Sequence, residues 1–132
     1  MTKASSKTRF LTITTIALAS IIGASAAHAQ SKYGAIAYSS STGAKGYSYN
    51  YSTRSVAQLY AQRECEQRSG RGDCRVLVWF RNACGAVATS QNGAYGSAWA
   101  TDLGSAKNIA LNSCRNYGGS YCTVTAWSCT DR

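Results

Sequence analysis

The amino-acid sequence predicts an α+β fold, in which two tandem β-β-α-β repeats form one small, two-layer domain stapled by disulfides. Three observations support this prediction. Short sequence patterns recur at an offset of 48 to 51 residues. Each copy contains two strand patterns, one amphipathic helix pattern and a closing strand pattern. Six cysteines are present, and four of them occupy matching places in the two copies.

The first residues have the pattern of an export signal. A basic start at residues 3–9 precedes an apolar run at 11–23, and Ala27-His28-Ala29 has the small residues that a signal peptidase recognises. The apolar run is shorter than the roughly 20 residues needed to span a bilayer. We therefore expect residues 1–29 to be a cleaved Sec-type signal peptide. Residues 30–132 would then be a single periplasmic or secreted domain that does not insert into the membrane.

The repeat is visible in two pairs of segments. Tyr33-Gly34-Ala35-Ile36-Ala37 reappears as Cys84-Gly85-Ala86-Val87-Ala88, and Cys74-Arg75-Val76-Leu77-Val78-Trp79 is matched by Cys122-Thr123-Val124-Thr125-Ala126-Trp127. Because the order of the segments is kept, we interpret the pattern as a duplication. Repeat one covers about 33–83 and repeat two about 84–132.

Each repeat opens with two strands. The first is short and apolar, over 33–39 and 85–89. The second follows a turn rich in Gly, Ser and Asn, and it carries aromatic residues. Because side chains alternate across a strand, the three tyrosines of repeat one are expected on one face. These aromatic residues are Tyr47, Tyr49 and Tyr51 in repeat one and Trp99 in repeat two.

A helix and a closing strand complete each repeat. Apolar residues follow the helical spacing i, i+3, i+4 and i+8 in both copies. Ser52 and Thr101 are the expected N-caps. The closing strands are predicted over 75–80 and 123–128, with their tryptophans in the core. The helical stripes are Ala57, Tyr60, Ala61 and Cys65 in repeat one, and Ala106, Ile109, Ala110 and Cys114 in repeat two.

The cysteines predict a disulfide framework, because six cysteines in a small exported domain are typical of one. Fifteen pairings are possible, and the repeat reduces them. Two cysteines end equivalent helices and two begin equivalent strands, so equivalent bonds are expected, and the remaining two cysteines pair with each other. Metal binding is the competing interpretation, although there is no C-x2-C motif and no histidine after residue 28. The expected bonds are Cys65–Cys74, Cys114–Cys122 and Cys84–Cys129.

Four segments also resemble a known family: 33–39, 46–51, 74–86 and the closing Ala126-Trp127. Their pattern of Cys, Trp and Gly is similar to the DUF4189 family, small exported bacterial proteins that include secreted mycobacterial members and share a domain of unknown function. The resemblance covers essentially the whole mature chain. It implies export and disulfides, and it brings no catalytic residues to this sequence.

The residues argue against an enzyme. Glu64 and Glu66 are the nearest pair of carboxylates, but residues two apart on a helix point about 200° from each other. Asp73, Asp102 and Asp131 have structural explanations at a disulfide, a helix start and a chain end. Neither G-x-S-x-G nor S-x-x-K is present. We therefore expect no catalytic, cofactor-binding or metal-binding residues.

The charge suggests binding instead. From residue 30 onward eleven cations stand against five acids, a net charge of +6. Four arginines gather around the end of the first helix, where they either cap the helix or form an anion-binding patch. The tyrosine row either packs in the sheet or adds a binding platform. The candidate binding residues are therefore Arg63, Arg68, Arg71, Arg75, Tyr47, Tyr49 and Tyr51.

These observations predict an exported, non-enzymatic binding module of unknown ligand. An anionic envelope polymer or a protein is the expected partner, and export argues against nucleic acid. The alternative is an inhibitor or immunity-type protein against a lytic enzyme or toxin, since preorganised loops lose little entropy on binding.

Overall fold

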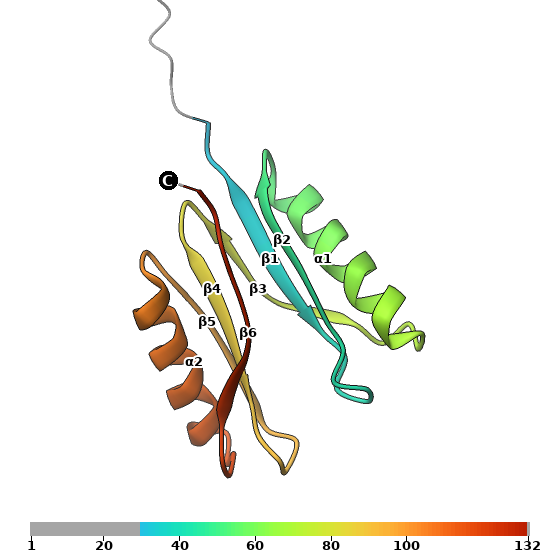
Figure 1. Cartoon of the computed structure of the whole chain (residues 1–132), viewed down its shortest axis with the longest axis vertical. Helices are drawn as coiled ribbons and strands as arrows, with labels where there is room; N and C mark the ends of the chain where they lie inside the picture. The colour runs from blue at the N-terminus through green and yellow to red at the C-terminus, as the bar shows by residue number, and fades with distance from the viewer. Residues whose placement is uncertain (1–29, 132) are drawn as a thin grey trace, which may run out of the picture.

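The computed structural model describes residues 30–131, so the expected signal peptide lies outside the described residues. The fold is α+β (Figure 1), and within this range no helix is long and apolar enough to cross a membrane. The elements in chain order are β1 (Tyr33–Tyr38), β2 (Lys45–Tyr51), α1 (Arg54–Ser69), β3 (Arg75–Arg81), β4 (Cys84–Thr89), β5 (Tyr95–Ala100), α2 (Leu103–Asn116) and β6 (Thr123–Cys129).

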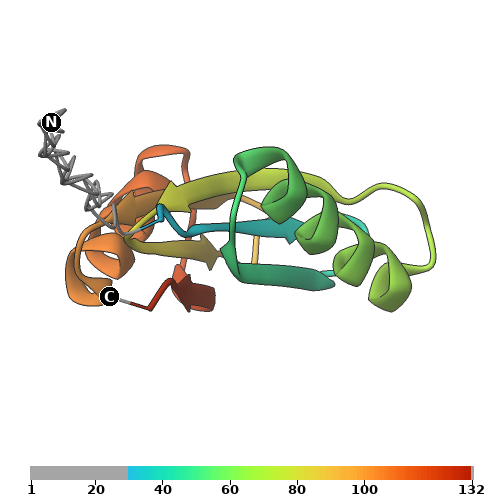
Figure 2. The ribbon, with the colours of Figure 1, turned by 90° about the horizontal axis from the view of Figure 1, so that it is seen from above.

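The strands form two antiparallel sheets, with the orders β2-β1-β3 and β5-β4-β6. The two sheets pack face to face, and α1 and α2 cover their outer faces (Figures 1 and 2). The prediction of two layers is therefore wrong, because the molecule has four. The reason lies in the central strands. Ala35 and Ala37 of β1 face α1, whereas Ile36 faces the other sheet, so both faces of the strand are apolar and both must be covered.

Small residues separate each helix from its sheet. Ala57 and Ala61 are fully buried against Ala35 and Ala37. At Gly46 of β2, a Cβ atom would lie 2.0 Å from the carbonyl oxygen of Ala61. Glycine is therefore required where the backbone of α1 lies directly on the strand. Because each helix lies so close to its sheet, large side chains do not fit between them. Tyr60 and Ile109, which were predicted to belong to the buried stripes of the two helices, are therefore exposed.

Both predicted N-caps are one residue too early. The Thr53 hydroxyl accepts from the amide of Val56 at 3.2 Å. The Asp102 carboxylate accepts from the amide of Ser105 at 2.7 Å.

Phe80 fills the space between the two sheets, and its ring is almost completely buried. The ring lies between two glycines on the central strands. A Cβ at Gly34 would lie 2.3 Å from a ring carbon, and a Cβ at Gly85 would lie 2.5 Å from another. The two central strands can therefore meet around one aromatic ring only because both positions lack a side chain.

The three disulfides are the predicted ones: Cys65–Cys74, Cys114–Cys122 and Cys84–Cys129. The first two join the end of each helix to the segment that enters the next strand. The third joins β4 to its neighbour β6. All six sulfur atoms are bonded, so the metal-binding interpretation of the cysteines is wrong. Three disulfides fit an exported protein.

Two glycine substitutions should change stability in opposite directions. Gly46→Ala places a methyl group against helix backbone that cannot move aside, and we expect it to lower the free energy of unfolding by roughly 1–3 kcal/mol. Gly104 lies within α2, and the nearest atom to a Cβ added there is Asp102 Oδ2, at 3.4 Å. We expect Gly104→Ala to raise the free energy of unfolding by roughly 0.5–1 kcal/mol. Urea unfolding of the oxidised proteins measures both free energies. If Gly46→Ala leaves the free energy of unfolding unchanged, the close packing of α1 on β2 is contradicted.

Candidate functional site: two grooves between the edge strands

The face-to-face packing leaves a groove along each side of the sandwich. On one side β3 runs beside β5, and on the other β2 runs beside β6. Side-chain hydroxyls bridge both pairs of strands. Ser97 donates to the carbonyl of Leu77 at 3.1 Å, and Ser128 donates to the carbonyl of Ser48 at 3.4 Å. We call these the β3–β5 groove and the β2–β6 groove.

The β3–β5 groove consists of two hollows. The first, of about 570 Å³, contains Arg75, Tyr95 and Tyr117 in its lining. The second, of about 280 Å³, is lined by Trp79, Phe80, Arg81 and Trp99. An arginine therefore stands at each end of β3, and the six residue steps between them span roughly 20 Å of extended strand.

One tyrosine lies behind the first hollow. The rings of Tyr38 and Tyr95 are 5.8 Å apart. Burial, and secondarily the neighbouring Tyr95, raise the pKa of the Tyr38 hydroxyl.

The tryptophans of the closing strands are exposed, so their prediction as core residues is wrong. In β3 the side chains of Val78 and Phe80 face the second sheet, so Trp79 points to the opposite side, at the sheet's edge. The guanidinium of Arg54 lies 4.2 Å from the centre of its ring. Trp99 of β5 is 58% exposed. Alternation of apolar residues in a strand did not reveal that the edge of the sheet is uncovered.

The β2–β6 groove is a hollow of about 410 Å³, lined by Tyr47 and Tyr49 on β2 and by 125–129 on β6. Tyr49 is 58% exposed and Trp127 is 51% exposed. A cation accompanies an aromatic ring on each strand. The guanidinium of Arg68 lies 5.6 Å from the ring centre of Tyr47, and the ammonium of Lys107 lies 5.0 Å from that of Trp127.

The structure separates Tyr51 from the other two tyrosines. Asn50 has a φ of +62°, and the pairing of β1 with β2 is irregular at this point. This bulge reverses the alternation of side chains, so Tyr51 turns toward α1 and stacks on Tyr60 at 4.7 Å. Tyr47 and Tyr49 keep the predicted common face. The signal for this bulge in the sequence was Asn50 alone, because asparagine tolerates a positive φ.

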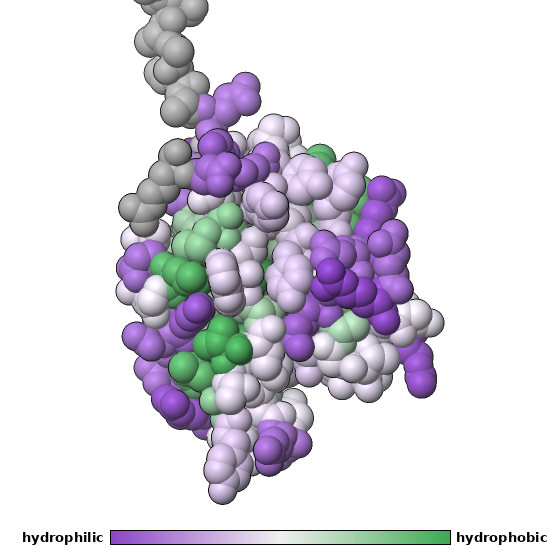
Figure 3. All heavy atoms as spheres, viewed as in Figure 1, coloured by the Kyte–Doolittle hydropathy of each residue, from purple (hydrophilic) through white to green (hydrophobic). Residues whose placement is uncertain are grey.

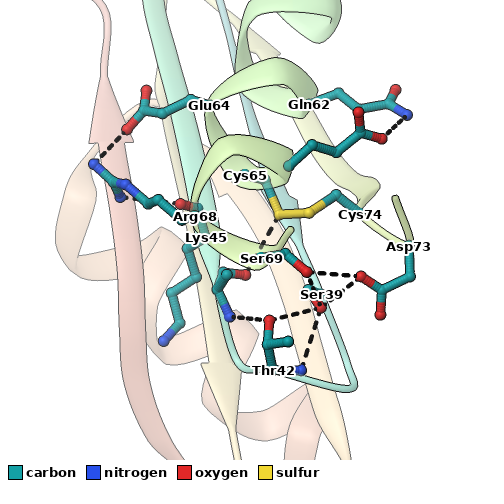
Figure 4. Close-up of a disulfide and its surroundings, with 12 residues drawn as sticks. Ser39, Thr42, Lys45, Gln62, Glu64, Cys65, Arg68, Ser69, Asp73 and Cys74 are labelled. Atoms are coloured by element: carbon teal, nitrogen blue, oxygen red, sulfur yellow. Dashed lines mark hydrogen bonds and ion pairs between the residues drawn. A yellow bond between two sulfur atoms is a disulfide. The ribbon is translucent and has the colours of Figure 1, made fainter. Parts of the chain in front are cut away.

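The four predicted arginines are distributed over the two sides of the first sheet. Arg68 lies beside β2, where it pairs with Glu64 at 2.7 Å and donates to the carbonyl of Lys45 at 3.0 Å (Figure 4). Arg75 begins β3, the opposite edge strand, and lines the other groove. Arg63 and Arg71 are exposed.

The two halves of the molecule differ in surface hydropathy on the face seen in Figure 3. A group of strongly hydrophilic residues lies over the half that contains α1, and hydrophobic residues gather over the half that contains α2.

All five carboxylates make structural contacts. Glu64 pairs with Arg68, and Glu66 accepts from Gln62 at 3.2 Å. Asp102 caps α2, and Asp131 accepts from Asn50 at 2.7 Å. Asp73 accepts from three serine hydroxyls, and none of the five lines a groove.

Residues 33–129 match the family described as "Domain of unknown function (DUF4189)". This chain belongs to the DUF4189 family. Protein Rv1269c of Mycobacterium tuberculosis and Protein Mb1300c of Mycobacterium bovis are each 40% identical to it over 103 residues, which is 78% of this chain and 73% of the relative. The NMR structure of Rv1813c from Mycobacterium tuberculosis superposes with a TM-score of 0.54 at 26% identity, covering 97% of this chain and 99% of that one.

In this DUF4189 protein a dense polar cluster lies beside the Cys65–Cys74 bond (Figure 4). The buried Ser39 donates to Asp73 at 2.8 Å, and Ser69 lies 2.9 Å from the same carboxylate. Hydrogen bonds from Ser41, Ser39 and Ser69 lower the pKa of Asp73 from 3.8 to about 2. So acidic a carboxylate is a weak base. The hydrogen bonds of the cluster hold the turn between β1 and β2 against the end of α1.

The lowered pKa predicts an acid-dependent loss of stability. The ionised Asp73 stabilises the fold above pH 4, and this contribution is lost as the pH falls from 4 toward 2. Asp73→Asn should therefore be less stable than the wild type at pH 7, and the two proteins should converge near pH 2. Urea unfolding across pH 2–7 measures the difference between them. A difference that does not vary with pH would show that the carboxylate charge does not hold this turn.

Proposed function

We propose that this protein is an exported, non-enzymatic binding module for an anionic glycan of the cell envelope, with the β3–β5 groove as its binding surface. The observation that carries the proposal is the lining of this groove. Trp79 and Trp99 line one hollow with Arg81, and Tyr95 and Tyr117 line the adjoining hollow with Arg75.

Exposed flat aromatic rings suit a sugar. The faces of an aromatic ring carry partial negative charge, and they attract the weakly positive C–H groups on one face of a pyranose ring. Trp99 exposes more than half of its surface, although the core of the protein lies next to it. A groove of roughly 20 Å accommodates several consecutive sugar rings, so the ligand we expect is a segment of a chain.

The charges around the groove favour an anionic chain. Arg75 and Arg81 line its hollows, and Arg54 lies over Trp79. Arginine donates to carboxylates through a fixed pair of N–H groups. From residue 30 onward the formal net charge is +6, which attracts anionic polymers at long range.

The carboxylates support a binding role over a catalytic one. A glycosidase needs two carboxylates on either side of the scissile bond. In residues 30–131 every Asp and Glu side chain makes a hydrogen bond or an ion pair with another part of the protein. The groove therefore has the groups that hold a glycan, without the pair that would hydrolyse it.

Export by a signal peptide at residues 1–29 and a duplication of the β-β-α-β unit are parts of the same proposal. The disulfides support the first, since they form in an oxidising compartment. The second is supported by the matching order of strands, β2-β1-β3 and β5-β4-β6.

Co-sedimentation with purified peptidoglycan sacculi tests the proposed function. We expect the oxidised mature protein to bind at low salt and to retain binding at 1 M salt, where charge attraction is screened beyond about 3 Å. Trp99→Ala should weaken the binding at least tenfold, because it removes an exposed stacking surface.

Leu59→Ala is the matched control, since Leu59 is an exposed apolar residue of α1 outside both grooves. If 1 M salt abolishes the binding, the attraction is nonspecific and due to charge. If Trp99→Ala leaves the binding unchanged, the β3–β5 groove is not the binding surface.

A specific loop favours a second candidate function, an inhibitor or immunity-type protein against a lytic enzyme or toxin. The Cys114–Cys122 bond closes a short loop in which Tyr117 is 76% exposed and Tyr121 is 82% exposed. Tyr121 has a φ of +54°, a conformation that a bulky residue adopts at a cost in energy. A rigid loop that presents tyrosines is typical of a protein-binding surface.

Tyr121→Ala separates the two candidates. An inhibitor would lose its inhibition of a muramidase with this variant, whereas the binding to sacculi should be unchanged. Measuring muramidase activity with and without the protein tests the second candidate directly, and an activity unaffected by an excess of the wild type would argue against it for that enzyme class.

A further inference from the structure

The β2–β6 groove repeats the features of the β3–β5 groove on the other side of the molecule. We infer that it is a second glycan site, and that the protein is bivalent and bridges two anionic glycan strands. This inference rests on the proposed function, because it assigns the same ligand chemistry to both grooves.

The aromatic pairs of the two grooves occupy corresponding positions. Trp79 pairs with Ala35 in the first sheet, and Trp127 pairs with Ala86 in the second. Tyr49 and Trp99 each stand three residues after the glycine, Gly46 or Gly96, that touches helix backbone. Each groove therefore presents one ring from a closing strand and one from the neighbouring edge strand of the opposite sheet.

Each closing-strand tryptophan also carries a cation. Arg54 lies 4.2 Å from the ring centre of Trp79, and Lys107 lies 5.0 Å from that of Trp127. These cations come from different helices and from different positions in them. A positive charge is thus placed beside an exposed indole in both grooves, which suits a carboxylate carried by a sugar that stacks on the ring.

A second cation stands on the β2 side of the groove. Arg68 lies over Tyr47 and pairs with Glu64. This ion pair is exposed, and exposed pairs contribute little stability, so the guanidinium can exchange its partner for a carboxylate of the ligand at small cost. A positive charge therefore stands on both the β2 side and the β6 side of the β2–β6 hollow.

The two grooves lie on opposite sides of the sandwich. β2 and β3 are the two edge strands of the first sheet, with β1 between them, and β6 and β5 are the edge strands of the second sheet. A short oligosaccharide in one groove cannot reach the other without passing around the molecule. Two occupied grooves therefore hold two strands, or two distant parts of one long strand.

Isothermal titration calorimetry with peptidoglycan tetrasaccharides released by muramidase measures the number of sites. We expect a stoichiometry of two for the wild type, one for Trp99→Ala, one for Trp127→Ala, and no binding for the double variant. On intact sacculi, each single variant should bind more weakly by a factor on the order of 10² or more, since avidity is lost together with the second site.

The outcomes separate this inference from the proposed function. A stoichiometry of one that Trp99→Ala abolishes and Trp127→Ala leaves unchanged would overturn bivalency and retain the β3–β5 site. A stoichiometry of one that only Trp127→Ala abolishes would overturn bivalency and the β3–β5 site, and would leave the β2–β6 groove as the single site. No binding to tetrasaccharides or sacculi would overturn the proposed function and this inference with it. Tyr49→Ala provides a second variant of the groove if Trp127→Ala does not fold, and Leu59→Ala is the control for both.

Discussion

The whole structure depends on the close contact of helix backbone with strand backbone at Gly46 and its counterpart Gly96. In the two clusters between a helix and its sheet, the buried residues are all alanine or cysteine, and such small residues bury little apolar area each. The disulfide at the end of each helix offsets this small core. On the loop-entropy model the two short loops contribute roughly 2.7 kcal/mol each and the Cys84–Cys129 loop roughly 4 kcal/mol, values that are large beside the stability of a typical small domain.

The thin helix-sheet layers also determine where the larger apolar side chains lie. Phe80, Ile36 and Val87 are buried between the two sheets, where there is room for them. Three-stranded sheets packed in this way have four edge strands, and the helices lie over the outer faces and leave the edges uncovered. Aromatic residues on the edge strands are consequently exposed, although they belong to sequences that read as core strands. The grooves are thus a direct result of packing two small sheets face to face.

The sequence predicted the order of the elements and the disulfides because these follow from local patterns and from segments that recur in the same order. It did not predict the four layers, although Ile36 within Ala35-Ile36-Ala37 was a sign that both faces of this strand are buried. The face of Tyr51 depends on a single bulge at Asn50, which periodicity cannot detect. Exposure of the tryptophans depends on which strand forms the edge of a sheet, and the sequence of a strand does not contain that information.

Polar contacts across the two grooves hold their strands in place. Asn50 and Asp131 make two hydrogen bonds, at 2.7 and 2.9 Å, which hold the end of β2 against the chain that follows β6. On the other side, Ser97 holds β5 to the backbone of β3. The Cys84–Cys129 bond anchors β6 to the central strand of its sheet. Because covalent and hydrogen bonds fix the strands that carry the aromatic rings, a ligand orders few protein groups when it binds, and the entropic cost of association is reduced.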